Sequence, residues 1–157
     1  MGNKCVINTD STIDGVLLTP LKVINVPGGD MLHSMKCSDP CYSGFGEAYF
    51  SMIEPSIVKA WKRHRKMTLN LVVPVGKVKF VIYDDRQNSE SGKKFLEVIL
   101  SRNNYYRLTI PPMVWIGFQG MDEYTSMLLN IADIEHTPEE ANRKEMNEIK
   151  YNWGLKK

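Results

Sequence analysis

Residues 57–76 read Ile57-Val-Lys-Ala-Trp-Lys-Arg-His-Arg-Lys66 and then Met67-Thr-Leu-Asn-Leu-Val-Val-Pro-Val-Gly76. Basic side chains fill most of positions 59–66, and apolar, strand-like sequence lies on both sides. Because alternate residues of a strand point to opposite faces, Lys62 and His64 would share one face, with Arg63 and Arg65 on the other. A strand that carries cations into a β-rich core indicates a site for an anionic ligand. The alternative is a solvated charge run on an edge strand.

The rest of the chain reads as strands separated by turns. Residues 77–83 alternate, with Val78, Phe80 and Ile82 on one face and Lys79 among the residues of the other. Further strands are expected at 15–24, 47–53, 57–64, 68–74, 95–100, 106–110, 114–118 and 125–132, and a long loop at 84–94. Strands repeating about every 10 residues, without βαβ alternation, indicate an all-β sandwich or jelly roll. We expect one such domain over residues 1–157.

One helix is expected near the C-terminus. The segment Thr137-Pro-Glu-Glu140 has a capping Thr, a Pro at the first helical position and a Glu at the third. This predicts a short helix from Pro138 to about Met146. Tyr151 and Trp153 follow, and two aromatic residues at a terminus predict a tail that packs against the domain.

Length and composition place further bounds on the protein. A chain of 157 residues with 43% hydrophobic and 24% charged residues is an ordinary globular protein with room for a full core. A net charge of +2 argues against a nucleic-acid binder, so clustered cations favour a small anionic ligand. The three cysteines, Cys5, Cys37 and Cys41, are expected to be free thiols in a reducing cytoplasm. No run of residues has the length of a membrane span, and we expect a cytoplasmic protein.

Motifs for nucleophilic catalysis or for phosphate cradling are missing from the sequence. Metal-binding jelly rolls of the cupin type need three or four His and Glu ligands. Of these, His64 alone is present, and Ile116 stands where a late His would be expected. We therefore expect neither a metal nor a cofactor.

Proton transfer is the chemistry that the sequence favours. His64 is the best candidate for a base because it lies beside Lys62, and abstraction of a proton next to a carbonyl requires a base and a cation that stabilises the enolate. His33 and His136 are the other histidines. Trp115 could form an aromatic wall for a sugar or base ring, or simply pack in the core. Asp84-Asp85 could be a carboxylate pair or the polar start of the loop.

Four segments resemble the dTDP-4-dehydrorhamnose 3,5-epimerase family, in that family's order and spacing. They are Glu47-Ala-Tyr-Phe-Ser51, Ile57-Val-Lys-Ala-Trp-Lys-Arg-His64, Val73-Pro-Val-Gly-Lys-Val-Lys-Phe-Val-Ile-Tyr-Asp-Asp-Arg86 and Ile110-Pro-Pro-Met-Val-Trp-Ile-Gly-Phe118. The resemblance extends over about residues 15–153. It implies a metal-free cupin jelly roll (a double-stranded β-helix), usually a homodimer through N-terminal strands. It also implies a dTDP-linked 4-keto-6-deoxyhexose as ligand.

The resemblance also places individual residues. Lys59 falls on the family's phosphate-contacting Arg, and Lys62 falls on its catalytic His, with His64 two positions further on. Ile116 replaces a second His, and Ile134 or Glu135 occupies the position of the catalytic Tyr. An early Asp-containing segment of the family is loosely matched by Asp30-Met-Leu-His33.

These observations predict a nucleotide-sugar epimerase or isomerase of deoxysugar or surface-polysaccharide synthesis. His64 or His33 would remove a proton next to the C4 ketone, and Lys62 would stabilise the enolate. Residues expected to bind the substrate, including its diphosphate, are Lys59, Arg63, Arg65, Trp115 and Asp30. Two alternatives are a non-catalytic nucleotide-sugar-binding protein and a 3,4-ketoisomerase that uses His64 together with His33.

Overall fold

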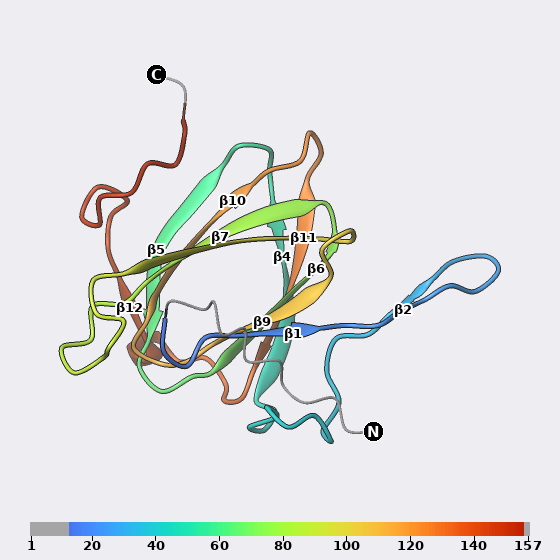
Figure 1. The fold of residues 1–157 in the computed structure, drawn as a ribbon, viewed down its shortest axis with the longest axis horizontal. Coiled ribbons are helices and arrows are strands. Elements are labelled where there is room, and N and C mark those ends of the chain that lie inside the picture. Colours follow the sequence, from blue (N-terminus) through green and yellow to red (C-terminus); the bar gives the residue numbers. More distant parts are fainter. Residues whose placement is uncertain (1–12, 156–157) are drawn as a thin grey trace.

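Two five-stranded antiparallel sheets face each other in the computed structural model, which describes residues 13–155 (Figure 1). Sheet I has the strand order β1 (Leu17–Pro20), β9 (Tyr106–Ile110), β6 (Leu69–Val75), β11 (Ser126–Ala132) and β4 (Glu47–Ile53). Sheet II has the order β12 (Ala141–Arg143), β5 (Val58–His64), β10 (Trp115–Gly120), β7 (Lys77–Tyr83) and β8 (Phe95–Ser101). Neighbours in each sheet are mostly distant in sequence, which is the topology of a jelly roll. The predicted cupin-type jelly roll is confirmed.

The hydrophobic core lies between the two sheets. Strand β7 shows why the sequence folds this way, because Val78, Phe80 and Ile82 are fully buried in the core and their alternation matches the two-residue period of a strand. Leu108 of β9 and Leu128 of β11 meet them from sheet I. The predicted strand boundaries at 47–53, 77–83 and 106–110 agree with β4, β7 and β9.

The prediction of a helix at residues 138–146 is wrong. A single turn of 3-10 helix, Pro138–Glu140, is followed at once by strand β12, which pairs antiparallel with β5. Thr137 makes no side-chain cap. The Glu140 carboxylate, which should have helped to start the helix, instead accepts 2.7 Å hydrogen bonds from the backbone N–H groups of Lys66 and Met67. Pairing with the open edge of β5 therefore replaces helix formation.

The C-terminal segment covers the outer face of sheet II, as predicted for Tyr151 and Trp153. Trp153 packs 5.4 Å from Trp61, measured between ring centroids, in a second apolar cluster that also contains Val81 and Ile149. The indole N–H of Trp61 donates to the Met146 carbonyl at 3.3 Å. The tail thus fixes the segment that follows β12 against β5.

A two-stranded arm extends away from the two large sheets (Figure 1). It consists of β2 (Val23–Ile24) and β3 (Met31–Leu32), which pair antiparallel. The chain after the arm is held by the fully buried Arg107, which donates to the Ser34 carbonyl and forms a 2.8 Å ion pair with Asp39.

The cysteines differ in part from the expectation of free thiols. Cys41 is disulfide-bonded, whereas Cys37 is an exposed free thiol, so these two do not pair with each other. Cys5 lies outside the described residues.

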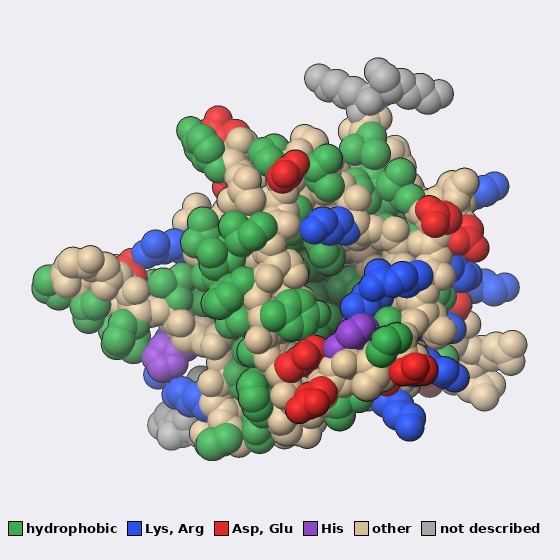
Figure 2. Space-filling view, turned by 180° about the vertical axis from the view of Figure 1, so that it is seen from behind, with side chains coloured by type: hydrophobic (Ala, Val, Ile, Leu, Met, Phe, Trp, Pro, Cys, Tyr) green, Lys and Arg blue, Asp and Glu red, His purple; other side chains and the backbone are tan. Residues whose placement is uncertain are grey.

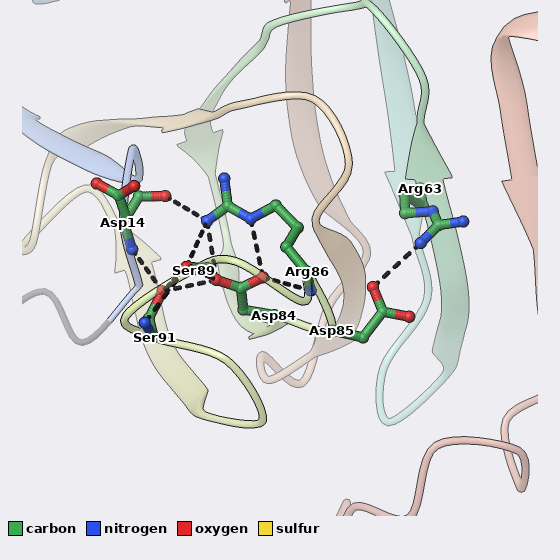
Figure 3. A network of polar contacts seen from close by, with 7 residues as sticks. All are labelled: Asp14, Arg63, Asp84, Asp85, Arg86, Ser89 and Ser91. Carbon is green, nitrogen blue, oxygen red and sulfur yellow. Dashed lines mark hydrogen bonds and ion pairs between the residues drawn. The ribbon is translucent and has the colours of Figure 1, made fainter.

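The predicted loop at 84–94 contains a closed polar cluster (Figure 3). The buried Asp84 carboxylate accepts hydrogen bonds from Arg86, Ser89 and Ser91 at 2.6 to 2.8 Å. Asp85 points elsewhere and pairs with Arg63 at 3.0 Å. The two aspartates therefore serve structural contacts, in line with the loop interpretation rather than with a carboxylate pair.

Candidate active site

A cavity of about 560 Å³ opens between the two sheets. Its walls come from β4, β6 and β11 of sheet I, from β5 and β10 of sheet II, and from residues 143–145 at the end of β12. Figure 2 shows a hollow in one face of the molecule, with Lys and Arg side chains and a histidine gathered beside it. The jelly roll thus leaves one end of its interior open, and cationic side chains are close to the opening.

Strand β5 contributes the charged wall. Lys62 and His64 line the cavity, while Arg63 between them does not. The pairing of β5 with β10 is regular at Arg63 and Lys62 and shifts register between Ile116 and Phe118. This irregularity lets Lys59, in addition to the alternating residues, reach the same cavity.

His64 is a neutral imidazole at physiological pH. The residue is only 5% exposed, and its Nδ1 has no hydrogen-bond partner among the described residues. Burial, and then the nearby charge of Lys62, lower the pKa of His64 to about 4, although Glu140 opposes the shift. A buried neutral imidazole with a free ring nitrogen is able to accept a proton from a ligand.

Lys62 is a half-buried amine without a carboxylate partner in the described part of the chain. Burial, and then the charge of Arg143, lower the pKa of Lys62, while Glu47 acts in the opposite direction. Cations that repel each other in a partly desolvated cavity are stabilised when an anion enters. This electrostatic arrangement favours an anionic ligand.

Two further cations stand at the rim. Lys59 is exposed, and its ammonium donates to the Met52 carbonyl at 3.3 Å. Arg143 lies opposite Lys62 in the register of β12 with β5. Sequence reasoning missed Arg143 because it placed this residue in a helix, where it would have no fixed relation to Lys62. The neighbouring Lys144 is turned toward Trp115, with its Nζ 5.0 Å from the ring centroid.

The opposite wall is uncharged, and it combines polar side chains with Leu69 and Leu71 of β6. Tyr49 and Ser51 of β4 and Asn130 of β11 line the cavity, and the Asn130 amide donates to Ser51 Oγ at 3.0 Å and to the Tyr49 carbonyl at 3.3 Å. Burial, and then the charge of Glu47, raise the pKa of Tyr49. These residues were not among the predicted site residues. The alternation of the correctly predicted strand 47–53 was the signal that could have found Tyr49 and Ser51.

Three of the predicted binding residues lie away from the cavity. Arg63 pairs with Asp85, and its guanidinium carbon lies 4.6 Å from the centroid of the Trp115 ring. Trp115 is buried in the second apolar cluster, and its indole N–H donates to Asp85 at 2.8 Å. Arg65 is exposed and borders a separate groove with Met113 and Glu139.

The arm carries the other two predicted residues. Asp30 forms an ion pair with Arg102. His33 borders a separate space of about 30 Å³ near Thr19 and Asp39. The structure of the single chain therefore brings together Lys59, Lys62 and His64, and it does not bring His33 or Asp30 to them.

Within residues 13–155, no group of three or more His, Cys, Asp and Glu side chains is arranged to hold a metal ion. Over the same range, no helix is long and apolar enough to cross a membrane.

Solved structures of two sugar-nucleotide enzymes are similar to this chain. No family model matches the chain. A solved dTDP sugar isomerase from Desulfovibrio desulfuricans is 38% identical, with a TM-score of 0.89 over 93% of this chain and 95% of that one. A dTDP-4-dehydrorhamnose 3,5-epimerase from Bacillus anthracis, solved with TDP and PPi bound, has a TM-score of 0.80 at 18% identity, covering 91% of this chain and 87% of that one.

Two curated relatives of the chain are named as proteins of glycan or polysaccharide biosynthesis. The probable low-salt glycan biosynthesis epimerase Agl13 of Haloferax volcanii is 32% identical over 84 residues, which are 53% of this chain and 54% of the relative. The match thus spans about half the length of that protein. The spore coat polysaccharide biosynthesis protein SpsL of Bacillus subtilis is 23% identical over 90% of this chain and 96% of its own length.

The fold, together with the likeness to the dTDP sugar isomerase over nearly the whole chain, defines a sugar epimerase or isomerase of the jelly-roll class. The chain belongs to the family of the dTDP sugar isomerase with which it shares 38% identity, and its fold is that of the dTDP-4-dehydrorhamnose 3,5-epimerases that its sequence resembles.

Proposed function

We propose that this protein is a cofactor-independent epimerase or isomerase of a dTDP-linked 4-keto-6-deoxyhexose and that it acts in polysaccharide synthesis. The observation that carries the proposal is the cavity wall of β5, where a neutral buried His64 stands beside Lys62, a cation with no carboxylate partner among residues 13–155. The names of the relatives, a dTDP sugar isomerase and proteins of glycan and spore coat polysaccharide biosynthesis, support the substrate class.

The first chemical step is proton abstraction from a carbon next to the C4 ketone. His64 accepts the proton, the C–H bond breaks, and its electron pair moves into the carbonyl to give an enolate. Lys62 stabilises the negative charge on the enolate oxygen, because a cation in a partly desolvated site acts more strongly than one in water. The imidazolium that forms then returns the proton or exchanges it with the solvent.

Diphosphate binding is assigned to Lys59 and Arg143 at the rim. Both are exposed and border the same cavity as Lys62, so a ligand could place its diphosphate at the rim and its sugar deeper inside. Arg143 takes the part that was predicted for Arg63 or Arg65. Arg63 already has a carboxylate and a ring as partners on the outer face of sheet II.

Ketone migration between C3 and C4 is a second candidate reaction, favoured by the name of the 38% identical relative, a dTDP sugar isomerase. It starts with the same proton abstraction at C3 and differs in where the proton returns. The structure gives no support to the version with His33 as the partner of His64, because His33 borders a different space.

A homodimer is the proposed assembly. The β2–β3 arm exposes Ile24 and Met31, and the edge strand β4 exposes Phe50 and Met52. Apolar side chains on a projecting arm and on an open sheet edge favour contact with a second copy. Light scattering after size exclusion should give twice the monomer mass of 18.0 kDa. A mass of one chain at micromolar concentration would contradict this assembly.

The activity is tested by incubating the protein with dTDP-4-keto-6-deoxyglucose in D₂O and following the C3 and C5 protons by NMR. The proposal predicts loss of at least one of these signals, since an enolate takes up deuterium from the solvent. A new epimer would identify epimerisation, and a ketone moved to C3 would identify ketone migration. Full retention of both signals, at a protein concentration that binds dTDP, would contradict enolising chemistry on this sugar.

A further inference from the structure

Inversion of a carbon centre needs two groups on opposite faces of that carbon. One removes the proton, and the other donates a proton to the opposite face of the planar enolate. A single base that worked alone would return the proton to the face from which it came. The cavity has two walls, and the proposed base His64 occupies only the wall formed by sheet II.

Tyr49 lies on the wall across from His64. It belongs to β4 of sheet I, and the two-residue period of that strand turns Tyr49 and Ser51 into the cavity and leaves Phe50, 62% exposed, on the other face. The register of β4 with β11 sets Tyr49 directly opposite Asn130. Since the Asn130 amide also donates to the Tyr49 carbonyl, the backbone that carries the phenol is held in place by its neighbouring strand.

The phenol of Tyr49 is available to a ligand. Its hydroxyl has no hydrogen bond to another residue of the described range 13–155, and the residue is 38% exposed where it lines the cavity. Burial and the charge of Glu47 raise the pKa of Tyr49, so the phenol carries its proton at neutral pH. Glu145, another cavity-lining group that could transfer protons, follows the strand paired with β5 and hence lies on the side of the base.

We infer that Tyr49 is the proton donor that completes the inversion, an inference that rests on the proposed function. The Tyr49 O–H bond breaks, and the electron pair of the enolate forms a new C–H bond on the face opposite His64. The phenolate that remains takes a proton from the solvent. In this arrangement base and acid come from different sheets, and the stereochemical outcome depends on strand β4.

The test is the Tyr49→Phe variant, assayed in D₂O with dTDP-4-keto-6-deoxyglucose alongside the wild type. Deletion of the donor should leave His64 able to exchange the substrate proton, while epimer formation falls by about 10² or more. The ratio of exchange to epimerisation should therefore rise by the same factor. Tyr124→Phe, which removes the hydroxyl of a 72% exposed tyrosine, is the matched control and should leave the ratio unchanged.

Three outcomes would overturn the inference. Epimerisation by Tyr49→Phe at the wild-type rate would show that another group donates the proton. A parallel loss of exchange and epimerisation, with dTDP affinity and melting temperature retained, would show that Tyr49 serves the first step instead. A wild type that neither exchanges nor epimerises this sugar would contradict the proposed function itself, and the inference would fall with it.

Discussion

The Asp84 cluster and the cavity wall of β5 both contain buried polar groups, and they differ in how these groups are satisfied. Around Asp84, hydrogen bonds from Arg86, Ser89 and Ser91 fill the carboxylate's acceptor sites (Figure 3). Along the cavity, Lys62 has no carboxylate partner among residues 13–155, and Nδ1 of His64 has no hydrogen bond. Buried polar groups in proteins are usually paired, so we propose that the unpaired groups lining the cavity are available to a ligand.

Strand β5 shows the same contrast over three consecutive residues. Arg63 faces outward to Asp85 and the Trp115 ring, whereas Lys62 and His64 face the cavity. The basic run in the sequence thus divides into Arg63, which has structural partners, and the cavity-lining Lys62 and His64, to which we propose a function. The residue types alone do not distinguish these two groups of basic side chains. They are distinguished by the partners that the fold places beside each side chain.

The largest effect is expected for His64→Gln, which removes the proposed base and keeps a polar side chain of similar size. Loss of a general base lowers turnover by about 10² to 10⁴, and deuterium exchange into the substrate should fall in parallel. The dTDP affinity should stay within a few-fold of the wild-type value, because His64 is not assigned to the diphosphate. Turnover at the wild-type rate would remove His64 from the mechanism.

A smaller loss is expected for Lys62→Met, which keeps length and removes the cation. Loss of one group that stabilises a developing oxyanion costs about 10² to 10³ in turnover. Lys62→Arg restores the charge and should recover part of the activity. Equal activity of the Met and Arg variants would show that the charge of Lys62 has no role in the reaction.

Stability, rather than activity, should change in Asp84→Asn. The variant leaves Arg86 without its charged partner in a buried cluster, and breaking such a pair costs about 3 kcal/mol. For a chain of this size the melting temperature should fall by roughly 6–12 °C. Asp85→Asn, at a neighbouring and partly exposed carboxylate, is the matched control with a smaller expected loss. Comparable losses in the two variants would contradict the structural role given to the Asp84 cluster.

The smallest effect is a difference in pH dependence. Because the folded pKa of His64, about 4, lies below its unfolded value of 6.5, the unfolded chain binds the proton first as pH falls. The stability linked to neutral His64 is complete above pH 6.5 and is lost between about 6.5 and about 4. Asp84 acts in a lower window. Burial would raise its pKa, but the hydrogen bonds of its cluster hold that pKa well below its ordinary value, so its contribution is lost only under more acidic conditions.

Urea unfolding of the wild type and of His64→Gln at pH 7, 6 and 5 measures this difference. The wild type should lose stability more steeply than the variant, by up to about 1.4 kcal/mol per pH unit for one proton. Parallel stability curves over this range would show that His64 is not buried as a neutral group.

The strands could be predicted well from the sequence, because alternation records which face of a strand is buried. Residues 77–83 show this directly, since Val78, Phe80 and Ile82 enter the core, while Lys79 on the other face donates to the Trp153 carbonyl. The prediction was wrong at 138–146, where local helix signals lost to pairing with the edge of β5. The conformation of that region depends on hydrogen bonds that Glu140 accepts from residues more than 70 positions away in the sequence. A local sequence pattern carries no information about such distant partners.

The site was predicted in part for the same reason. The two-residue period of a strand predicted Lys62 and His64 on one face, and both line the cavity. Arg143 depended on the missed strand β12. Arg63 and Trp115 were predicted to bind the substrate, but they lie on the side of sheet II that the C-terminal tail covers. Which side the tail covers is determined by the tertiary packing and is not visible in the sequence.

A crystal structure of the protein with dTDP would show whether the ligand binds at the inner face of β5, beside Lys62 and His64. We expect the diphosphate at the cavity rim within hydrogen-bonding distance of Lys59 and Arg143, with the sugar-bearing end directed toward Lys62 and His64. A diphosphate bound instead to Arg63 or Arg65, which do not line this cavity, would contradict this binding site.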